Sequence, residues 1–234
     1  MITLSELSST PDGIDGVRVL AETLTAETEH PFYVIAYGTP GRRAPEALIH
    51  NFPSSWINMA DDENLLKRDP VARLLKDNFC TPVIWGKEVY EQSKQMDIWE
   101  SAATFGLKSG IDLPFFLGTN RWIMINVARD SAVSGLGRLA IEIGMMKTVA
   151  AHLIGAAVPV FDAMTFLKTL SSDEYDLLSW LSSGSSIDEL AMKRRRAISS
   201  IKRSLDSLAV RSGMPDHMAT AALFMRGQAY YSKM

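Results

Sequence analysis

Apolar positions in the first 160 residues recur with two different periods. Over residues 17–28 they recur at helical intervals after a Pro-Asp-Gly turn, which predicts a helix. Residues 32–37 are aromatic and β-branched and end at a Gly-Thr-Pro-Gly turn, which predicts a strand with residues 47–51 as its hairpin partner. The same signals predict short helical pieces over 53–79, a strand at 82–85, a helix at 98–105, paired strands at 110–117 and 121–127, and a long amphipathic helix over 133–157.

This order of elements determines the fold expected for the first part of the chain. Adjacent strands between flanking helices indicate a central antiparallel sheet with helices on both faces, an α/β/α sandwich. The sequence lacks the alternating strand–helix rhythm of a parallel sheet, and it lacks a Gly-x-Gly-x-x-Gly or Walker loop. We therefore expect neither a nucleotide-binding fold nor a bound cofactor.

The last 65 residues carry helical signals only. A serine within residues 170–174 caps a helix with an acidic first turn, Gly184 ends that helix, and Ser186 caps a second, shorter one. A third helix has an apolar stripe at Ile198, Ile201, Leu205 and Leu208. This arrangement predicts an all-α helix-turn-helix domain, although the periodicity alone also fits any small three-helix bundle.

The predicted fold class is therefore α+β, with two domains of unequal size. The N-terminal sandwich is expected over residues 1–160, a short linker over 161–169, and the helix-turn-helix domain over 170–234. Hydrophobic residues make up 47% of the chain and charged residues 22%, which is typical of globular domains and predicts that both parts fold.

The net charge of −3 conceals a strongly basic segment. Residues 193–211 hold seven basic side chains against Asp206 alone, so this segment favours a polyanion as partner; the alternative is a solvated helix face. Because a reading helix presents its first turns to base edges and its flanking cations to phosphates, we expect DNA as the partner. The candidate DNA-binding residues are Arg194, Arg195, Arg196, Ser199, Ser200, Lys202 and Arg203.

The cysteine, the histidines and the apolar stretches of the chain bear on three questions: metal binding, localisation and enzyme activity. The single cysteine, Cys80, is expected as a small core residue, and the four scattered histidines show no metal-ligand spacing. The N-terminus has no secretory pattern, and the apolar stretch 148–161 is too short to span a bilayer, so we expect a cytoplasmic protein without a membrane partner. Ser109 stands one position too late for a Gly-x-Ser-x-Gly elbow, which argues against a serine hydrolase.

Residues 170–227 resemble the C-terminal domain of LuxR-type regulators without a gap. The segment 192–197 departs from the family pattern, and Ser204 stands where a histidine is common. The matching residues are Leu170, Glu174, Leu178, Trp180, Gly184, Glu189, Leu190, Ala191, Ser200, Ile201, Leu205 and Gly227.

Residues 15–160 independently resemble the autoinducer-binding sensor domain of the same family. The order and spacing of five short motifs carry this resemblance, and family members bind N-acyl homoserine lactones through this domain. The motifs are Phe-Pro-Ser-Ser-Trp at 52–56, Asp-Pro-Val at 69–71, Pro-Val-Ile-Trp at 82–85, Trp-Glu-Ser-Ala at 99–102 and Gly-Leu-Lys-Ser-Gly at 106–110, followed by Pro114.

The resemblance implies roles for individual residues. It gives Trp56 the lactone carbonyl, Asp69 the acyl-amide N–H, and Trp85 a packing role against the ring. Three positions depart from the pattern: Ala60 and Leu65 replace tyrosines, and Met124 replaces a serine or threonine. Losing hydrogen-bond donors weakens lactone recognition, so the signal is a lactone, another apolar molecule, or none. The full set of candidate ligand-binding residues is Trp56, Ala60, Asp69, Trp85, Trp99 and Met124.

The leading hypothesis is a DNA-binding transcription regulator that forms a homodimer, or a heterodimer with a related regulator. The helices at 133–157 and 219–224 offer apolar faces for this pairing. The second hypothesis is an interaction protein that does not bind DNA and modulates a related regulator, suggested by the altered segment 192–197. A lactone hydrolase is a weaker third, because no catalytic base is visible in the sequence.

Overall fold

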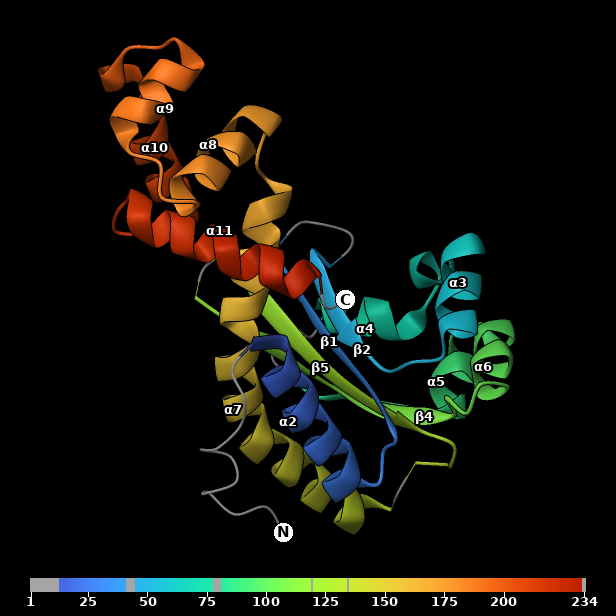
Figure 1. The fold of residues 1–234 in the computed structure, drawn as a ribbon. Coiled ribbons are helices and arrows are strands. Elements are labelled where there is room, and N and C mark those ends of the chain that lie inside the picture. The colour runs from blue at the N-terminus through green and yellow to red at the C-terminus, as the bar shows by residue number, and fades with distance from the viewer. Residues whose placement is uncertain (1–12, 41–44, 78–80, 119, 134, 233–234) are drawn as a thin grey trace. The chain divides into compact units, whose positions relative to one another are not determined.

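The structure is a computed structural model that describes residues 13–40, 45–77, 81–118, 120–133 and 135–232 (Figure 1). The expectations for the N-terminal segment and for Cys80 fall outside the described residues. The chain divides into two compact units, Met1–Ala156 and Ala157–Met234. Each unit is described by itself.

The N-terminal unit is built on a five-stranded antiparallel sheet in the order β2-β1-β5-β4-β3. The paired strands predicted around the turn at 118–120 are β4 and β5, and the predicted hairpin partners are β1 and β2. The fold is α+β, which confirms the predicted sheet. The strands are β1 (Phe32–Gly38), β2 (Ala47–His50), β3 (Val83–Trp85), β4 (Ser109–Phe116) and β5 (Trp122–Arg129).

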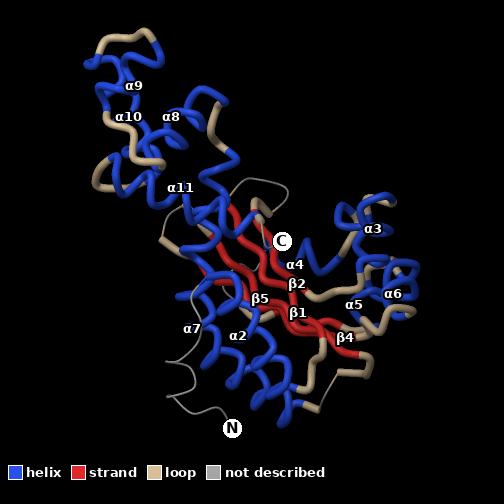
Figure 2. Tube along the Cα trace, in the orientation of Figure 1, coloured by secondary structure: helices blue, strands red, loops and turns tan. Residues whose placement is uncertain are grey.

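One face of the sheet is covered by two long helices, α2 (Gly13–Thr28) and α7 (Leu136–Lys168) (Figures 1 and 2). Side chains alternate between the faces of a strand, so the odd-numbered positions of β5 share one face. At the end of that row, Arg129 contacts Glu142 of α7 with an Nη1–Oε1 distance of 3.1 Å. This face carries the aliphatic core of the unit, including Ile35, Ile111, Leu113, Ile123, Ile125 and Val127, each at most 2% exposed.

The opposite face is covered by a group of short helices (Figure 2). They are α3 (Ser54–Asp62), the 3-10 turn η1 (Leu65–Lys67), α4 (Pro70–Asp77), α5 (Lys87–Gln92) and α6 (Met96–Ala103). Asp69–Pro70, predicted to interrupt the helical pattern, separates η1 from α4. Buried residues from these helices and the sheet form one apolar cluster: Ala60, Leu65, Val71, Val83, Trp85, Tyr90, Ile98, Ala102, Leu107 and Ala128.

Helix α7 is longer than the helix predicted over 133–157, and it includes most of the predicted linker. Residues 161–168 are helical and continue α7 through Pro159, so the predicted linker 161–169 is not an irregular segment. The reason is that Ala157, Phe161 and Met164 are buried at intervals of four and three residues, and their packing outweighs the hydrogen bond that a proline cannot donate. The division between the two units falls within this helix.

The length of α7 also bears on the expectation about membranes. The apolar stretch at 148–161 lies within a 33-residue helix, which by length and composition alone is long enough to cross a membrane. Its most apolar 18-residue window has a mean hydropathy of 1.6, and half of that window is buried inside the protein. Burial of this kind is what the core helix of a folded domain requires.

The C-terminal unit consists of the end of α7 and four further helices. These are α8 (Ser172–Ser182), α9 (Ile187–Arg194), α10 (Ile198–Ser212) and α11 (His217–Tyr231). Ser171 and Ser186 cap α8 and α9, each in a capping box with the glutamate three residues later. The core contains Leu178, Leu190, Ile201, Leu205 and Phe224, each at most 1% exposed.

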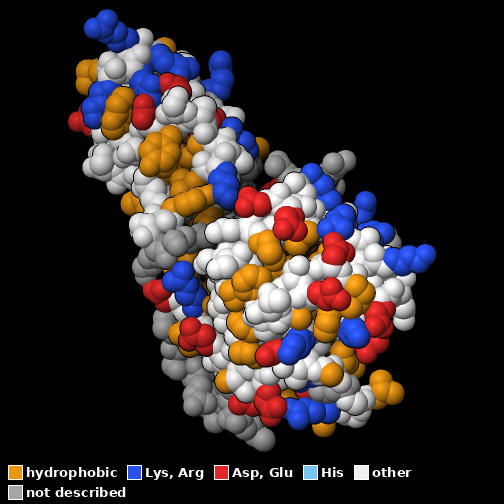
Figure 3. Space-filling view, turned by 90° about the vertical axis from the view of Figure 1, so that its right-hand side faces the viewer, with side chains coloured by type: hydrophobic (Ala, Val, Ile, Leu, Met, Phe, Trp, Pro, Cys, Tyr) orange, Lys and Arg blue, Asp and Glu red, His pale blue; other side chains and the backbone are white. Residues whose placement is uncertain are grey.

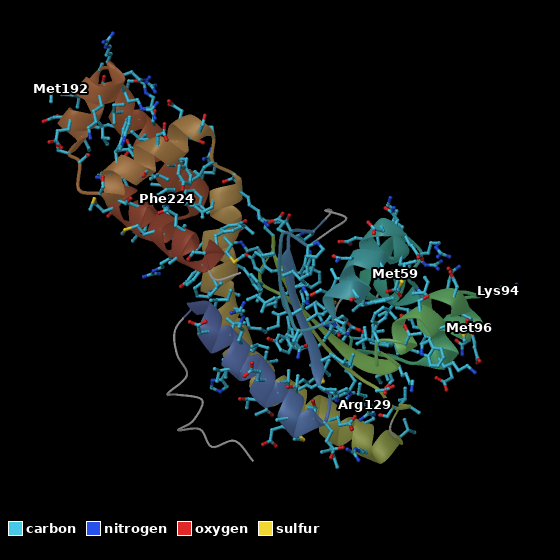
Figure 4. All side chains as sticks on the ribbon, turned by 45° about the vertical axis from the view of Figure 1, so that its right-hand side comes forward. Met59, Lys94, Met96, Arg129, Met192 and Phe224 are labelled. Atoms are coloured by element: carbon cyan, nitrogen blue, oxygen red, sulfur yellow. The ribbon has the colours of Figure 1, made fainter. Side chains whose placement is uncertain are left out.

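Helix α11 changes one expectation about dimerisation. Its residues 220, 221, 223 and 224 are buried in the core of the C-terminal unit. Phe224, labelled in Figure 4, is fully buried and contacts the ring of Tyr175 at a centroid distance of 4.9 Å. The apolar face predicted over 219–224 is therefore occupied within the protomer and is not free for pairing.

Gly227 is where α11 approaches α7 too closely for a side chain. A Cβ at this position would lie 2.6 Å from the carbonyl oxygen of Ala163 and 2.8 Å from Leu167 Cγ. Because a backbone atom cannot move away cheaply, we expect Gly227→Ala to lower the free energy of unfolding by about 1–3 kcal/mol. Urea unfolding followed by circular dichroism measures this change.

Gly155→Ala in α7 is the matched control. A Cβ there would meet no atom within 4 Å. Its expected effect is a gain of about 0.5–1 kcal/mol, because alanine is a better helix former than glycine. Equal stability of the two variants would show that the α7–α11 contact does not constrain this position.

Candidate functional site

A row of polar side chains crosses the sheet on the face that the short helices cover. The strand register pairs Asp112 of β4 with Asn126 of β5, and Asn126 with Val34 of β1. His50 of β2 continues the row beyond Val34. Asp112 is 2% exposed and Asn126 is 6% exposed. The row is therefore a buried polar strip, because the neighbouring rows of the same face are mainly apolar.

Several polar atoms around this row lack hydrogen-bond partners among the described residues. By strict hydrogen-bond geometry these are Asp112 Oδ2, Asn126 Oδ1, Trp85 Nε1 and His50 Nδ1. The side chains of Asn126 and Trp85 nevertheless lie close enough to the Asp112 carboxyl to lower its pKa by hydrogen bonding. Trp85 belongs to the same group because β3 pairs it with Gly110, two residues before Asp112. A Cβ on Gly110 would lie 2.5 Å from the indole of Trp85, so the glycine makes room for the ring.

Asp69 stands close to this group at the start of α4. Its Oδ1 accepts hydrogen bonds from the backbone N–H of Val71 at 2.8 Å and from the Tyr90 hydroxyl at 3.3 Å. Tyr90 also packs edge-on against Trp85, with ring centroids 6.5 Å apart. Burial raises the pKa of the Asp69 carboxyl and that of the Tyr90 hydroxyl. Asp69 is thus both a helix-capping group and a polar group of the site.

Asp112 is the group of the site whose pKa is moved closest to neutral pH. Burial raises the pKa of its carboxyl to about 7, and the negative charge of Asp69 acts in the same direction, while hydrogen bonds with Asn126 and Trp85 act against this rise. Taking a carboxylate out of water without a matching cation disfavours its charged form. Near neutral pH this side chain therefore holds or releases a proton in response to small changes around it.

The other expected ligand-site residues lie on the same side of the sheet. They differ in how far their side chains are buried or already hydrogen-bonded within the protein. Trp56 of α3 is partly buried, with its ring 5.9 Å from that of Phe105, and Ala60 is buried in the apolar cluster. Met124 lies on the same sheet face, paired with Pro114. Trp99 donates its indole N–H to the Lys108 carbonyl at 2.8 Å, which leaves only its ring for a ligand.

Three polar residues of this site are not found by reasoning from the sequence: Tyr90, Asp112 and Asn126. The available signal was a charged residue inside the otherwise apolar strand around Asp112. Both strands were predicted, but only their register places Asp112 beside Asn126.

The C-terminal unit presents the second candidate surface, on which the structure divides the predicted basic residues into two groups. Arg194 is held internally: its guanidinium donates to the Asp173 carboxylate, to the Asp173 carbonyl at 3.0 Å and to Asp176 at 3.4 Å. It also lies 4.7 Å over the ring of Trp180. The structure therefore gives Arg194 a structural role within the unit, and its part in DNA binding stays a prediction.

Arg196 is also partnered within the unit, though it is more exposed than Arg194. It pairs with Asp173 at 3.5 Å and donates to Ser200 Oγ at 3.0 Å. Arg195 adopts a left-handed conformation with φ of 50° where α9 ends, and its side chain is exposed. Within the described part of the chain, the exposed candidates without a protein partner are Arg195, Ser199, Lys202 and Arg203.

Helix α10 separates a buried side from an exposed side. Ile201, Leu205 and Leu208 are at most 1% exposed, whereas Lys202 and Arg203 are exposed. Ile198 was expected to face inward, but it is 45% exposed because it starts α10, directly after the turn. Met192 is also exposed, at 72%, and is labelled in Figure 4. Figure 3 shows several Lys and Arg side chains on the surface of this unit.

Residues 16–157 match the family model of the autoinducer-binding domain. The chain belongs to the LuxR-type quorum-sensing regulators. It is 25% identical to the transcriptional activator VanR of Vibrio anguillarum over 166 residues, which is 69% of each chain. It is 27% identical to the quorum-sensing regulator RhlR of Pseudomonas aeruginosa over 165 residues, 68% of this chain and 66% of that one. Both relatives are named as regulators and not as enzymes.

Solved structures of other proteins share the fold. SdiA of Escherichia coli superposes with a TM-score of 0.57 at 20% identity, over 97% of this chain and 95% of that chain. CepR2 of Burkholderia cenocepacia, described as an N-acylhomoserine lactone dependent factor, superposes with a TM-score of 0.54 at 16% identity, over 66% and 90%. These similarities place the sheet and its helices in the family fold.

The raised pKa of Asp112 predicts a specific pH dependence of stability. Between pH about 4 and about 7 the folded protein holds a proton on Asp112 that the unfolded chain has released. The contribution of this group is therefore most favourable at low pH and is lost as the pH rises through about 7. The free energy of unfolding that this group contributes is expected to fall by a total on the order of 4 kcal/mol.

Asp112→Asn removes this titration while nearly preserving shape. The difference in unfolding free energy between the variant and the parent is expected to grow in favour of the variant from pH 5 to pH 8. Glu100→Gln, at an exposed position, is the control and should leave the profile unchanged. Parallel profiles for Asp112→Asn and the parent would show that Asp112 does not titrate in this range.

Proposed function

We propose that this protein is a cytoplasmic transcription regulator whose N-terminal unit binds a small apolar signal and whose helix α10 reads DNA. The observation that carries the DNA-reading part is the division of α10 into a buried aliphatic side and an exposed side with Lys202 and Arg203. The names of its relatives VanR and RhlR as regulators support the proposal.

The contacts of α9 and α10 fit a helix-turn-helix module. α9 ends at Arg194, three residues form the turn, and α10 begins at Ile198. The first turn of α10 has no acidic residue, so its positive dipole end is not neutralised and favours phosphate. In such modules the second helix enters the major groove with its N-terminal residues at base edges. Ser199 and Arg195 are the exposed residues at that end.

A dimer would place two such helices on adjacent half-sites. Leu136 and Ile141 of α7 are 85% and 65% exposed, which leaves an apolar surface on this helix for a second protomer. Burying these side chains between protomers would remove them from water. We propose α7 as the pairing surface, with either an identical chain or a related regulator as partner.

The ligand site fits an acyl compound with a polar group. The apolar cluster provides surface for a hydrocarbon chain, and Asp69 and Trp85 provide polar atoms beside it. CepR2 is described as lactone-dependent, and SdiA has been solved in complex with octanoyl-rac-glycerol. We therefore propose an acyl homoserine lactone or a monoacylglycerol as the class of signal for this chain.

A second candidate function is a regulator-binding protein that does not contact DNA itself. The observation in its favour is Asp173, which pairs with both Arg194 and Arg196 and neutralises two of the expected cations. A measurement of DNA binding separates the two functions.

Removing a phosphate-binding cation should weaken DNA binding and its salt dependence together. We expect Lys202→Ala and Arg203→Ala each to lower the affinity for a duplex of about 30 base pairs and to reduce the slope of log K against log salt by about 0.9. Fluorescence anisotropy at several salt concentrations measures both quantities.

Lys94→Ala, an exposed cation of the N-terminal unit, is the control (Figure 4). It should leave both the affinity and the slope unchanged. If the parent protein binds neither random nor promoter-derived duplexes, with or without a related regulator, the DNA-reading function is wrong and the second candidate stands.

Asp69 should contribute to signal binding. N-octanoyl homoserine lactone and 1-octanoyl-rac-glycerol are the probes, and isothermal titration calorimetry is the measurement. Asp69→Asn keeps the oxygen that caps α4 but loses the charge, so the affinity for the better probe is expected to fall about tenfold without loss of the fold.

Asp62→Asn, at an exposed carboxylate at the end of α3, serves as the control and should bind like the parent. An unchanged affinity in Asp69→Asn would assign Asp69 to helix capping alone.

A further inference from the structure

An exposed apolar patch lies between the end of α9 and the start of α10. Met192 of α9 is 72% exposed, Ile198 of α10 is 45% exposed, and Ala197 just before Ile198 is exposed as well. The three side chains line one open hollow of the surface together with Ala191. Because much of Met192 and Ile198 remains in water, burial in the core of the unit accounts only in part for apolar side chains at these two places.

The surroundings of this patch are mainly cationic. Arg195 and Arg196 line the same hollow, and Lys202 follows Ile198 by one turn of α10. Asp188 of α9 is the acidic residue at the edge of the hollow. An apolar hollow among cations fits an occupant that carries negative charge beside an apolar group. DNA meets this description, because its phosphates flank bases of which thymine presents a methyl group.

The position of the patch favours DNA over an acidic protein segment as the occupant. Ala197 is the N-cap residue of α10 and Ile198 is the first residue of the helix. In a helix-turn-helix module, the residues at this end of the second helix meet base edges in the major groove. Arginine, asparagine and glutamine select guanine or adenine there by paired hydrogen bonds. Alanine and isoleucine side chains form no hydrogen bond, so they discriminate between bases by apolar contact.

Among the four bases, thymine is the one that presents an apolar group in the major groove, its 5-methyl group. We propose that Ala197, Ile198 and Met192 form a contact site for this methyl group, so that the protein prefers DNA elements with thymine opposite the start of α10. This inference rests on the proposed DNA-reading function and adds the base that is read. The flanking Arg195 and Lys202 bind phosphates, which position the protein on the duplex and do not specify the base.

The test removes the methyl group and leaves every hydrogen-bonding group of the DNA in place. A duplex is first selected from a random-sequence pool by the full chain, with and without the two acyl probes. Each thymine is then replaced in turn by deoxyuridine, and fluorescence anisotropy at one salt concentration measures the affinity of each duplex. We expect one such replacement in each half-site to lower the affinity about fourfold, the contribution of one buried methyl group.

Variants of the patch identify the side chains that contact the methyl group. Ile198→Ala and Met192→Ala each shorten one apolar side chain and should reduce the fourfold difference between thymine and deoxyuridine. Both variants should bind the deoxyuridine duplex about as the parent does, because the coupling belongs to the methyl contact alone. Ile198→Val keeps most of the apolar surface and should keep the difference.

Val210→Ala is the matched control. Val210 is an apolar residue near the other end of α10 and is 82% exposed. Its replacement removes a similar amount of apolar surface from the same helix and should leave the fourfold difference unchanged.

The outcomes separate this inference from the function on which it rests. If the protein binds a selected duplex but no deoxyuridine replacement changes the affinity, the methyl contact is wrong and the DNA-reading function stands. A hollow that serves a protein partner gives this result. The inference is equally wrong if Ile198→Ala keeps the full fourfold difference, because another residue then contacts the methyl group. If the chain binds no duplex, with or without the acyl probes, the DNA-reading function is overturned together with the methyl contact.

Discussion

Every buried polar atom must find a partner, and this constraint divides the sheet of the N-terminal unit into two faces with different properties. On the face beneath α2 and α7, the buried charge of Arg129 is matched by Glu142 at 3.1 Å, among aliphatic residues. On the opposite face, Asp112 has no such cation, and its pKa rises to about 7. One face thus pairs its buried cation with a carboxylate, whereas the other holds a buried carboxyl for which the described residues supply no cation.

The difference between the faces follows from the period of a strand. Residues two apart in β4 and β5 share a face, so a single charged residue at an even position enters the ligand side and leaves the aliphatic core undisturbed. The short helices α3 to α6 then enclose Asp112 together with Asp69, Tyr90 and Trp85.

The sequence was sufficient for features that depend on neighbouring residues. Ser171 and Ser186 sit three residues before glutamates, and both form the predicted type of helix cap. Features that depend on distant residues were not predictable. The pairing of Asp112 with Asn126 requires the strand register, and the capture of Arg194 by Asp173 and Trp180 joins positions 21 and 14 residues apart. The predicted long helix ended too early, because a proline is a local signal for a helix end, whereas the burial of the residues beyond it depends on tertiary packing.

The partners of Arg194 also explain how an altered turn is held in the C-terminal unit. Exposed ion pairs contribute about 0–1 kcal/mol, but Arg194 is only partly exposed, stacks on Trp180 and donates to two carboxylates and a carbonyl. These contacts fix the end of α9, where Arg195 takes the left-handed conformation that redirects the chain into α10. Basic residues of the same predicted segment therefore have different structural roles. Arg194 orients the helix, and Lys202 and Arg203 on the next helix stay exposed, because their neighbours Ile201 and Leu205 supply the buried contacts that hold α10 in place.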